Sequence, residues 1–171
     1  MSLDSLIFHF FFNLAGKNWF FNVVSVFFAR YLPFLIFISA VFFLFSLQDW
    51  KKRINLFFLS LVSIIISRGI IAESLSLLFK RPRPFEVFSL NSLIPSSGYS
   101  FPSDHMSFLF ALSFSVWIIN KKWGAALLFL SLFVGFGRIF VGVHWPSDIL
   151  AGIIIGVFSV LLSKKLIFNN K

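Results

Sequence analysis

Long runs of apolar residues alternate with short polar segments along the whole chain. A short apolar segment at Ser2–Leu14 and a turn at residues 15–18 precede five longer runs, at Trp19–Leu47, Ile54–Phe79, Phe101–Ile119, Ala125–Val143 and Asp148–Ser163. A helix of about 20 apolar residues crosses the hydrocarbon core of a bilayer. The pattern therefore predicts about five spanning helices. The first segment is shorter and contains Asp4 and His9, so it predicts an interfacial helix or a sixth span.

The composition favours a membrane protein over a soluble one. Of the 171 residues, 58% are hydrophobic and 12% are charged, and 28 are phenylalanine. A soluble domain of this length has too little interior to bury so much apolar surface. Because the chain has no cysteine, disulfides and thiolate metal sites are excluded. We expect an all-α integral membrane helix bundle, formed by residues 1–171 as a single domain and without a cleavable signal peptide.

The net charge of +9 indicates how this bundle is oriented. In a soluble protein it would suggest nucleic acid, but in a membrane protein it indicates cytoplasmic basic loops and anionic lipid. We therefore expect the bilayer, and no nucleic acid, as a partner. One face of the bundle is the more basic and is predicted to be cytoplasmic; it collects Lys51, Lys52, Arg53, Lys121, Lys122, Lys164, Lys165 and Lys171. The opposite face, predicted to be extracytoplasmic, has Lys17, Lys80, Arg81, Arg83 and Arg138.

Four polar segments are expected to meet at this outer face. They are KRPRPF at Lys80–Phe85, FPSDH at Phe101–His105, RIFVGVH at Arg138–His144 and WPSD at Trp145–Asp148. Polar side chains at the ends of membrane helices are costly unless they have a partner or a function. Because arginines and histidines dominate the collection, it predicts a site for an anion.

His144 and Asp148 form the first candidate pair. If Pro146 begins a helix, the two side chains lie four residues apart on one helical face. A carboxylate that binds one ring nitrogen fixes the imidazole tautomer and leaves the other nitrogen free as a nucleophile. The alternative is that Asp148 only stabilises a helix N-terminus. Considered alone, the spacing favours that alternative.

The segment FPSDH predicts a second part of the site. A helix that starts at Pro102 leaves the backbone N–H groups of Ser103, Asp104 and His105 available to phosphate oxygens. The Ser103 hydroxyl is a further donor, and His105 can protonate a leaving oxygen as a general acid. The alternative is an ordinary helix cap.

The arginines supply charge that matches a phosphate. Arg83 and Arg138 can each bind phosphate oxygens in a fork, which lysine cannot do. The alternative is anchoring at the membrane interface, which suits Lys80 and Arg81 better than Arg138 because Arg138 lies within a predicted span. We expect Arg30, also within a span, either to pair with a carboxylate or to reach the interface.

Together, these segments resemble the type 2 phosphatidic acid phosphatase (PAP2) superfamily of membrane lipid phosphatases. Its signature has three parts, Lys-x6-Arg-Pro, Pro-Ser-Gly-His and Ser-Arg-x5-His-x3-Asp, which correspond here to Ser76–Pro84, Pro102–His105 and Gly137–Asp148. The resemblance implies a two-step reaction without metal or cofactor. In it, His144 attacks phosphorus to form a phosphohistidine, His105 protonates the leaving group, and water hydrolyses the intermediate. Arg83, Arg138 and Ser103 would hold the phosphate.

Three positions depart from that signature. Ser76 replaces the usual Lys, Gly137 the usual Ser, and Asp104 the usual Gly. The missing lysine leaves one phosphate contact absent, or supplied by Lys80 or Arg81. FPSDH and the stretch FFARYLPFL at Phe27–Leu35 are similar to the bacterial undecaprenyl-diphosphate phosphatase branch, which acts outside the cytoplasm. That similarity implies a plasma-membrane enzyme that converts undecaprenyl diphosphate to the monophosphate and so recycles a carrier lipid of the cell wall.

Two alternatives remain open. The same enzyme class could act on another lipid, such as phosphatidylglycerol phosphate, phosphatidate or lipid A. A non-catalytic lipid binder or transport component is the alternative from a different class. The two histidines and Asp148 argue against it, because a binder needs arginines but no nucleophile with an orienting acid.

Overall fold

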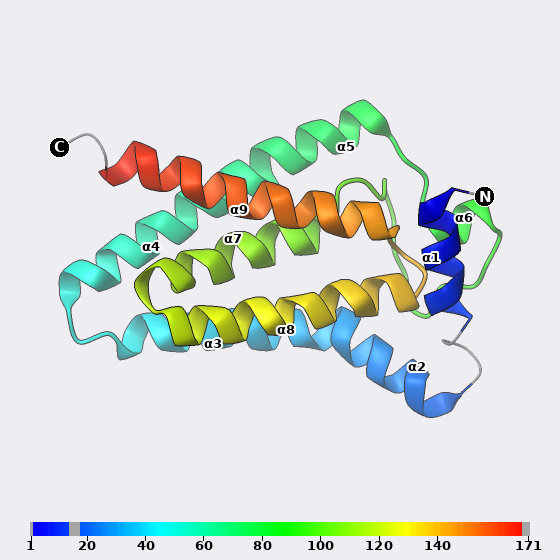
Figure 1. Ribbon diagram of the computed structural model, residues 1–171, viewed down its shortest axis with the longest axis horizontal. Helices are drawn as coiled ribbons and strands as arrows, with labels where there is room; N and C mark the ends of the chain where they lie inside the picture. Colours follow the sequence, from blue (N-terminus) through cyan, green and yellow to red (C-terminus); the bar gives the residue numbers. More distant parts are fainter. Residues whose placement is uncertain (1, 14–17, 169–171) are drawn as a thin grey trace.

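The computed structural model describes residues 2–13 and 18–168, and over these ranges the chain is helical and contains no strand (Figure 1). Most of the expected turn at residues 15–18, with Lys17, and also Lys171 lie outside the described residues. The α-helices are α1 (Leu3–Phe12), α2 (Trp19–Val26), α3 (Leu32–Ser46), α4 (Trp50–Ile64), α5 (Glu73–Phe79), α6 (Pro84–Val87), α7 (Asp104–Ile119), α8 (Lys121–Phe140) and α9 (Pro146–Phe168). The predicted all-α membrane helix bundle is confirmed.

Four segments are long and apolar enough to cross a membrane. They are Trp19–Ser46, Trp50–Val87, Lys121–Phe140 and Pro146–Phe168. The remaining predicted span contains α7, which has 16 residues and packs against α3, α4, α8 and α9. Because its neighbours enclose it, α7 forms the centre of the bundle. Helix α1 has 10 residues, which is too short to span a bilayer and suits the predicted interfacial helix.

The two ends of the bundle differ in what they contain. The turns α3–α4 and α7–α8 lie at the left end in Figure 1. At the right end, α1 and α6 lie beside the end of α8 and the start of α9, and the connection that enters α7 comes from the same end. The four polar segments therefore do converge at one end, as their order along the chain predicted.

Two stretches within the first two spans are π-helical, Phe27–Tyr31 and Ile65–Ala72. A π-helix forms i→i+5 hydrogen bonds, so residues five apart lie on the same side. This explains the ion pair between Arg68 and Glu73, whose Nη1 and Oε2 atoms lie 3.0 Å apart. In an α-helix, with 3.6 residues per turn, two residues five apart do not share a face. Arg68 also binds Asp104 of α7, with 3.1 Å between Nη2 and Oδ2, and so ties the second span to the centre of the bundle.

Helices α7 and α9 approach closely at two glycines four residues apart. A Cβ atom at Gly152 would lie 2.7 Å from the Ser103 carbonyl oxygen, and one at Gly156 would lie 2.7 Å from Cβ of Phe110. Small residues at this spacing are a common way for membrane helices to pack backbone against backbone. The close approach places Ser103 beside Asp148, where the Ser103 N–H donates to the Asp148 carbonyl oxygen at 3.1 Å.

Candidate active site

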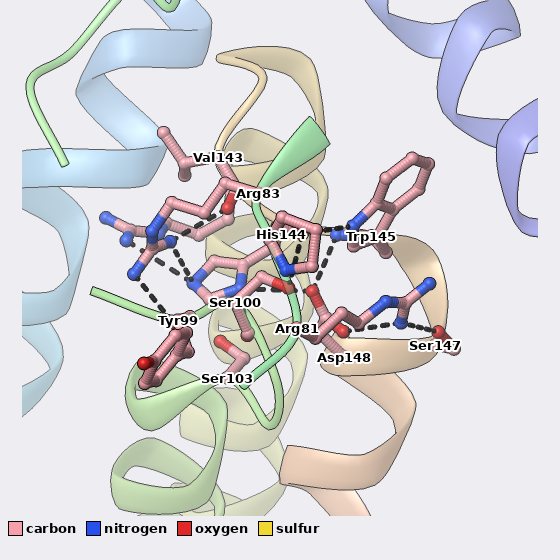
Figure 2. Close-up of polar contacts among 12 residues, drawn as sticks. Arg81, Arg83, Tyr99, Ser100, Ser103, Val143, His144, Trp145, Ser147 and Asp148 are labelled. Carbon is pink, nitrogen blue, oxygen red and sulfur yellow. Dashed lines mark hydrogen bonds and ion pairs between the residues drawn. The ribbon is translucent and has the colours of Figure 1, made fainter. Parts of the chain in front are cut away.

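His144 lies in the turn between α8 and α9 and is 2% exposed. Its Nδ1 lies 2.9 Å from the carbonyl oxygen of Ser100 and 3.5 Å from Oδ2 of Asp148. Both oxygens are acceptors, so Nδ1 carries the ring proton and Nε2 has a free lone pair. The sequence pointed to Asp148 as the partner of the ring. In the structure the Ser100 carbonyl is the nearer partner and Asp148 the second (Figure 2).

Two buried guanidinium groups flank the free nitrogen. Nη1 of Arg83 and Nη2 of Arg138 each lie 3.5 Å from Nε2 of His144. The two arginines are 6% and 7% exposed. An anion that contacts Nε2 would therefore also meet both positive charges.

Backbone carbonyl groups hold Arg83 in place. Its guanidinium donates to the carbonyl oxygens of Ser97, Gly98, Tyr99 and Val143 at 2.8–3.1 Å. Arginine has five N–H donors, so one is left, and Nη1 directs it toward His144. No role for residues 97–99 follows from the sequence, because a set of backbone carbonyl groups has no side-chain signature there.

Arg138 and Ser103 have buried donors without acceptors. Within the described part of the chain, Nε of Arg138 and Oγ of Ser103 make no hydrogen bond. Buried polar atoms are nearly always paired, so two such donors at one end of the bundle suit an anion ligand. The expectation for the Ser103 backbone was wrong, because its N–H is used by the Asp148 carbonyl and not kept free. Asp104 is the first residue of α7, and its carboxylate pairs with Arg68.

Asp148 is fully buried and connects His144 to a second arginine. Its Oδ2 accepts the N–H of Trp145 at 2.8 Å, and its Oδ1 accepts Nη1 of Arg81 at 2.8 Å (Figure 2). The guanidinium of Arg81 also lies over the Trp145 ring, 5.0 Å from its centroid. Both sequence interpretations of Asp148 therefore apply, because one carboxylate stabilises the start of α9 and also lies beside the imidazole.

Asp4 completes this network from the N-terminal helix. Its carboxylate forms an ion pair with Arg81 and accepts the Ser147 N–H at 2.9 Å, from a residue 143 positions away. Burial raises the pKa of Asp4, but the hydrogen bonds from Ser147 and Arg81 outweigh this effect and hold the pKa below its usual value. The signal for this role in the sequence is weak, because it consists only of an acid within an apolar segment.

The expectation that Lys80 or Arg81 replaces the missing first-motif lysine fits the geometry poorly. The guanidinium of Arg81 is occupied by Asp4, Ser147 and Asp148. Lys80 is exposed, has a left-handed backbone with φ of 45°, and forms no ion pair with any described residue. These two side chains thus lie behind Asp148 or at the surface, whereas Arg83 and Arg138 flank His144.

His105 is half-buried near the start of α7 and borders two pockets. One, of about 290 Å³, is also lined by Arg138 and Arg30; the other, of about 280 Å³, is lined by Arg68, Asp104 and Phe108. His105 is within electrostatic range of His144 and of both site arginines. Among the described residues, no group of three His, Asp or Glu side chains could hold a metal ion.

The chain is similar to known membrane phosphatases. The sequence pattern of the PAP2 superfamily matches residues 57–171. The chain is 30% identical over 154 residues to the bacitracin transport permease protein BcrC of Bacillus licheniformis, which covers 88% of this chain and 74% of that protein. It is 37% identical over 84 residues to the undecaprenyl-diphosphatase BcrC of Bacillus subtilis, which covers 48% of this chain and only 44% of that protein.

A solved structure agrees with these matches. The crystal structure of Aquifex aeolicus LpxE is 26% identical, covers 96% of both chains and superimposes with a TM-score of 0.79. The PAP2 superfamily match at residues 57–171 includes Arg83, Arg138, both site histidines and Asp148. The chain therefore belongs to the PAP2 superfamily and is a membrane hydrolase that acts on phosphate esters or diphosphates.

Proposed function

We propose that this enzyme hydrolyses undecaprenyl diphosphate to undecaprenyl phosphate through a phosphohistidine at His144. The observation that carries the proposal is the unprotonated Nε2 of His144, which has a guanidinium nitrogen 3.5 Å away on each of two sides. The lipid is suggested by the B. subtilis relative, which is an undecaprenyl-diphosphatase.

In the first step, Nε2 of His144 attacks the terminal phosphorus of the diphosphate. The bond from phosphorus to the bridging oxygen breaks, and His105 gives its proton to that oxygen. Arg83, Arg138 and the Ser103 hydroxyl bind the oxygens of the transferring phosphoryl group, where negative charge accumulates. The imidazole becomes positively charged, and the Ser100 carbonyl and Asp148 carboxylate beside Nδ1 stabilise it.

In the second step, water attacks the phosphohistidine. His105, now neutral, takes a proton from the water, the P–N bond breaks, and inorganic phosphate leaves with the electron pair of that bond returned to Nε2. Arg81 and Asp4 do not touch the phosphate in this mechanism. They act as positioning residues, because Arg81 binds the carboxylate oxygen of Asp148 that faces away from the imidazole.

We infer that the reaction takes place on the extracytoplasmic side of the plasma membrane. The site lies at the end of the bundle opposite the starts of α4 and α8, which contain Lys51, Lys52, Lys121 and Lys122. Basic loops of membrane proteins are enriched on the cytoplasmic side.

A second candidate is the same chemistry on another lipid phosphate, such as lipid A, phosphatidate or phosphatidylglycerol phosphate. It is favoured by the lipid A 1-phosphatase of Rhizobium johnstonii, whose match covers 58% of this chain at 30% identity, whereas the undecaprenyl-diphosphatase match covers 48% of it.

A substrate panel tests the proposed substrate. We expect purified protein in detergent with EDTA to release phosphate from undecaprenyl diphosphate with a higher kcat/KM than from the other three lipids. His144→Ala should lower the rate more than about 10³-fold, as loss of a nucleophile does in other enzymes. His9→Ala is the matched control, because the ring contacts of His9 are with Phe8 and Phe88 and not with a residue that flanks His144. Preference for another lipid would reject the substrate, and unchanged release by His144→Ala would reject the mechanism.

The acid limb of the pH profile tests the state of His144. Burial lowers the pKa of His144 to about 4, an effect that the Asp148 carboxylate partly offsets and Arg138 reinforces. Only the neutral ring is nucleophilic, so kcat/KM should stay high down to about pH 5 and fall as the pH drops through about 4. The measurement is kcat/KM against pH, corrected for ionisation of the substrate. A limb near pH 6.5, the ordinary imidazole value, would contradict the assignment.

Substitution of Asp4 tests the positioning network. In Asp4→Asn, Arg81 loses its ion-pair partner and holds Asp148 less firmly, so kcat should fall about tenfold, equivalent to about 1.4 kcal/mol, with little change in KM. Asp49→Asn is the matched control, since Asp49 also stabilises a helix start but at the opposite end of the bundle. An unchanged kcat in Asp4→Asn would reject the positioning role.

A further inference from the structure

Arg30 is a charged side chain within the first membrane-spanning segment. A guanidinium at membrane depth is costly, and such residues usually pair with an acid or mark a functional site. The first explanation does not hold here, because none of the ion pairs among the described residues involves Arg30. Arg68, in the second span, has both Glu73 and Asp104 as partners. The contact recorded for the Arg30 guanidinium is with the ring of Tyr31, its neighbour in sequence.

Arg30 lines the same pocket as two residues of the active site. This pocket, of about 290 Å³, is formed by Ala29, Arg30, Phe34, Ile94, Pro95, His105 and Arg138. Nη2 of Arg138 lies 3.5 Å from Nε2 of His144, so one residue that lines the pocket also contacts the proposed nucleophile. It therefore contains two arginines and His105, with no Asp or Glu among its lining residues.

Gly137 allows the Arg30 segment to approach this pocket. A Cβ atom at Gly137 would lie 2.8 Å from the backbone nitrogen of Ala29 and 2.8 Å from Cβ of Phe28. Real Cβ atoms do not come so close to backbone atoms, so a side chain here would push the π-helical segment Phe27–Tyr31 away from α8. Gly137 is also the position at which this sequence departs from the usual serine before the motif arginine. The departure thus has a structural consequence next to Arg30.

We propose that Arg30 binds the second phosphate of a lipid diphosphate, the one that stays with the leaving group; this inference rests on the proposed function. Arg83 and Arg138 surround the phosphorus that His144 attacks. His105 protonates the bridging oxygen, so the leaving phosphate lies on the His105 side. Arg30 borders the same pocket as His105 and can bind two phosphate oxygens in a fork. A lipid monophosphate has an uncharged carbon group at that position, so Arg30 selects diphosphates.

The test compares the inhibition of Arg30→Gln and wild type by inorganic pyrophosphate and by inorganic phosphate. The assay uses whichever lipid phosphate the wild type hydrolyses fastest. A charge-assisted hydrogen bond contributes enough that its loss should weaken inhibition by pyrophosphate about 10- to 100-fold. Inhibition by phosphate should change less than about threefold, and Arg30→Lys should retain part of the pyrophosphate affinity. Lys52→Gln, which removes one exposed charge at the other end of the bundle, should change neither.

Several outcomes would overturn the inference. If Arg30→Gln weakens inhibition by pyrophosphate and by phosphate equally, the substitution disturbs the site as a whole. If it weakens neither, Arg30 is only an interfacial anchor. Gly137→Ser provides a second variant that keeps Arg30. Because it displaces the Arg30 segment, it should weaken inhibition by pyrophosphate more than inhibition by phosphate. If the wild type hydrolyses lipid monophosphates and not undecaprenyl diphosphate, the proposed function fails. The ratio of the two inhibition constants still decides the role of Arg30.

Discussion

The site depends on two positive charges buried beside one neutral imidazole. A buried guanidinium is costly unless its donors are satisfied. Arg83 meets this requirement with four backbone carbonyls, whereas Arg138 retains a buried Nε with no acceptor in the described part of the chain. The protein thus holds Arg83 in place with its own carbonyl groups and leaves Arg138 with a donor that an anion can satisfy. The phosphoryl group that we propose as ligand supplies oxygens where the protein supplies only donors.

Asp148 links side chains at the edge of the bundle to this site. It is fully buried at the start of α9, where the close packing of α7 on α9 brings Ser103 against its carbonyl. One carboxylate oxygen lies beside His144, and the other binds Arg81, which Asp4 of the interfacial helix α1 holds in turn. The short N-terminal helix α1 is therefore connected to His144 through the three charged side chains of Asp4, Arg81 and Asp148, although it lies far from His144 in the sequence.

Much of the fold and of the site could be predicted from the sequence, for physical reasons. A bilayer requires long apolar helices, and each one that crosses it reverses the side on which the chain lies. The order of apolar runs and polar segments therefore predicts which polar segments lie at the same end of the bundle. His144, Asp148 and Arg138 became candidates through the three motifs taken together and the family resemblance, because the His144–Asp148 spacing alone favoured an ordinary helix start. The cradle of Arg83 could not be predicted, because Ser97 and Gly98 contribute carbonyls that every residue has. The pairing of Arg68 with Glu73 does not follow from an α-helical repeat, because it needs a π-helical turn.

The central claim, that His144 attacks phosphorus, can be tested by direct detection of its product. The protein would be mixed with a lipid diphosphate labelled in the terminal phosphate, denatured in alkali within one turnover, digested and analysed by mass spectrometry. Phosphoramidates of histidine survive alkali and hydrolyse in acid. We predict labelled phosphate on the peptide that contains His144, and its absence after acid treatment or in a His144→Ala variant. Turnover of the diphosphate with no phosphorylated His144 at any time would contradict the account.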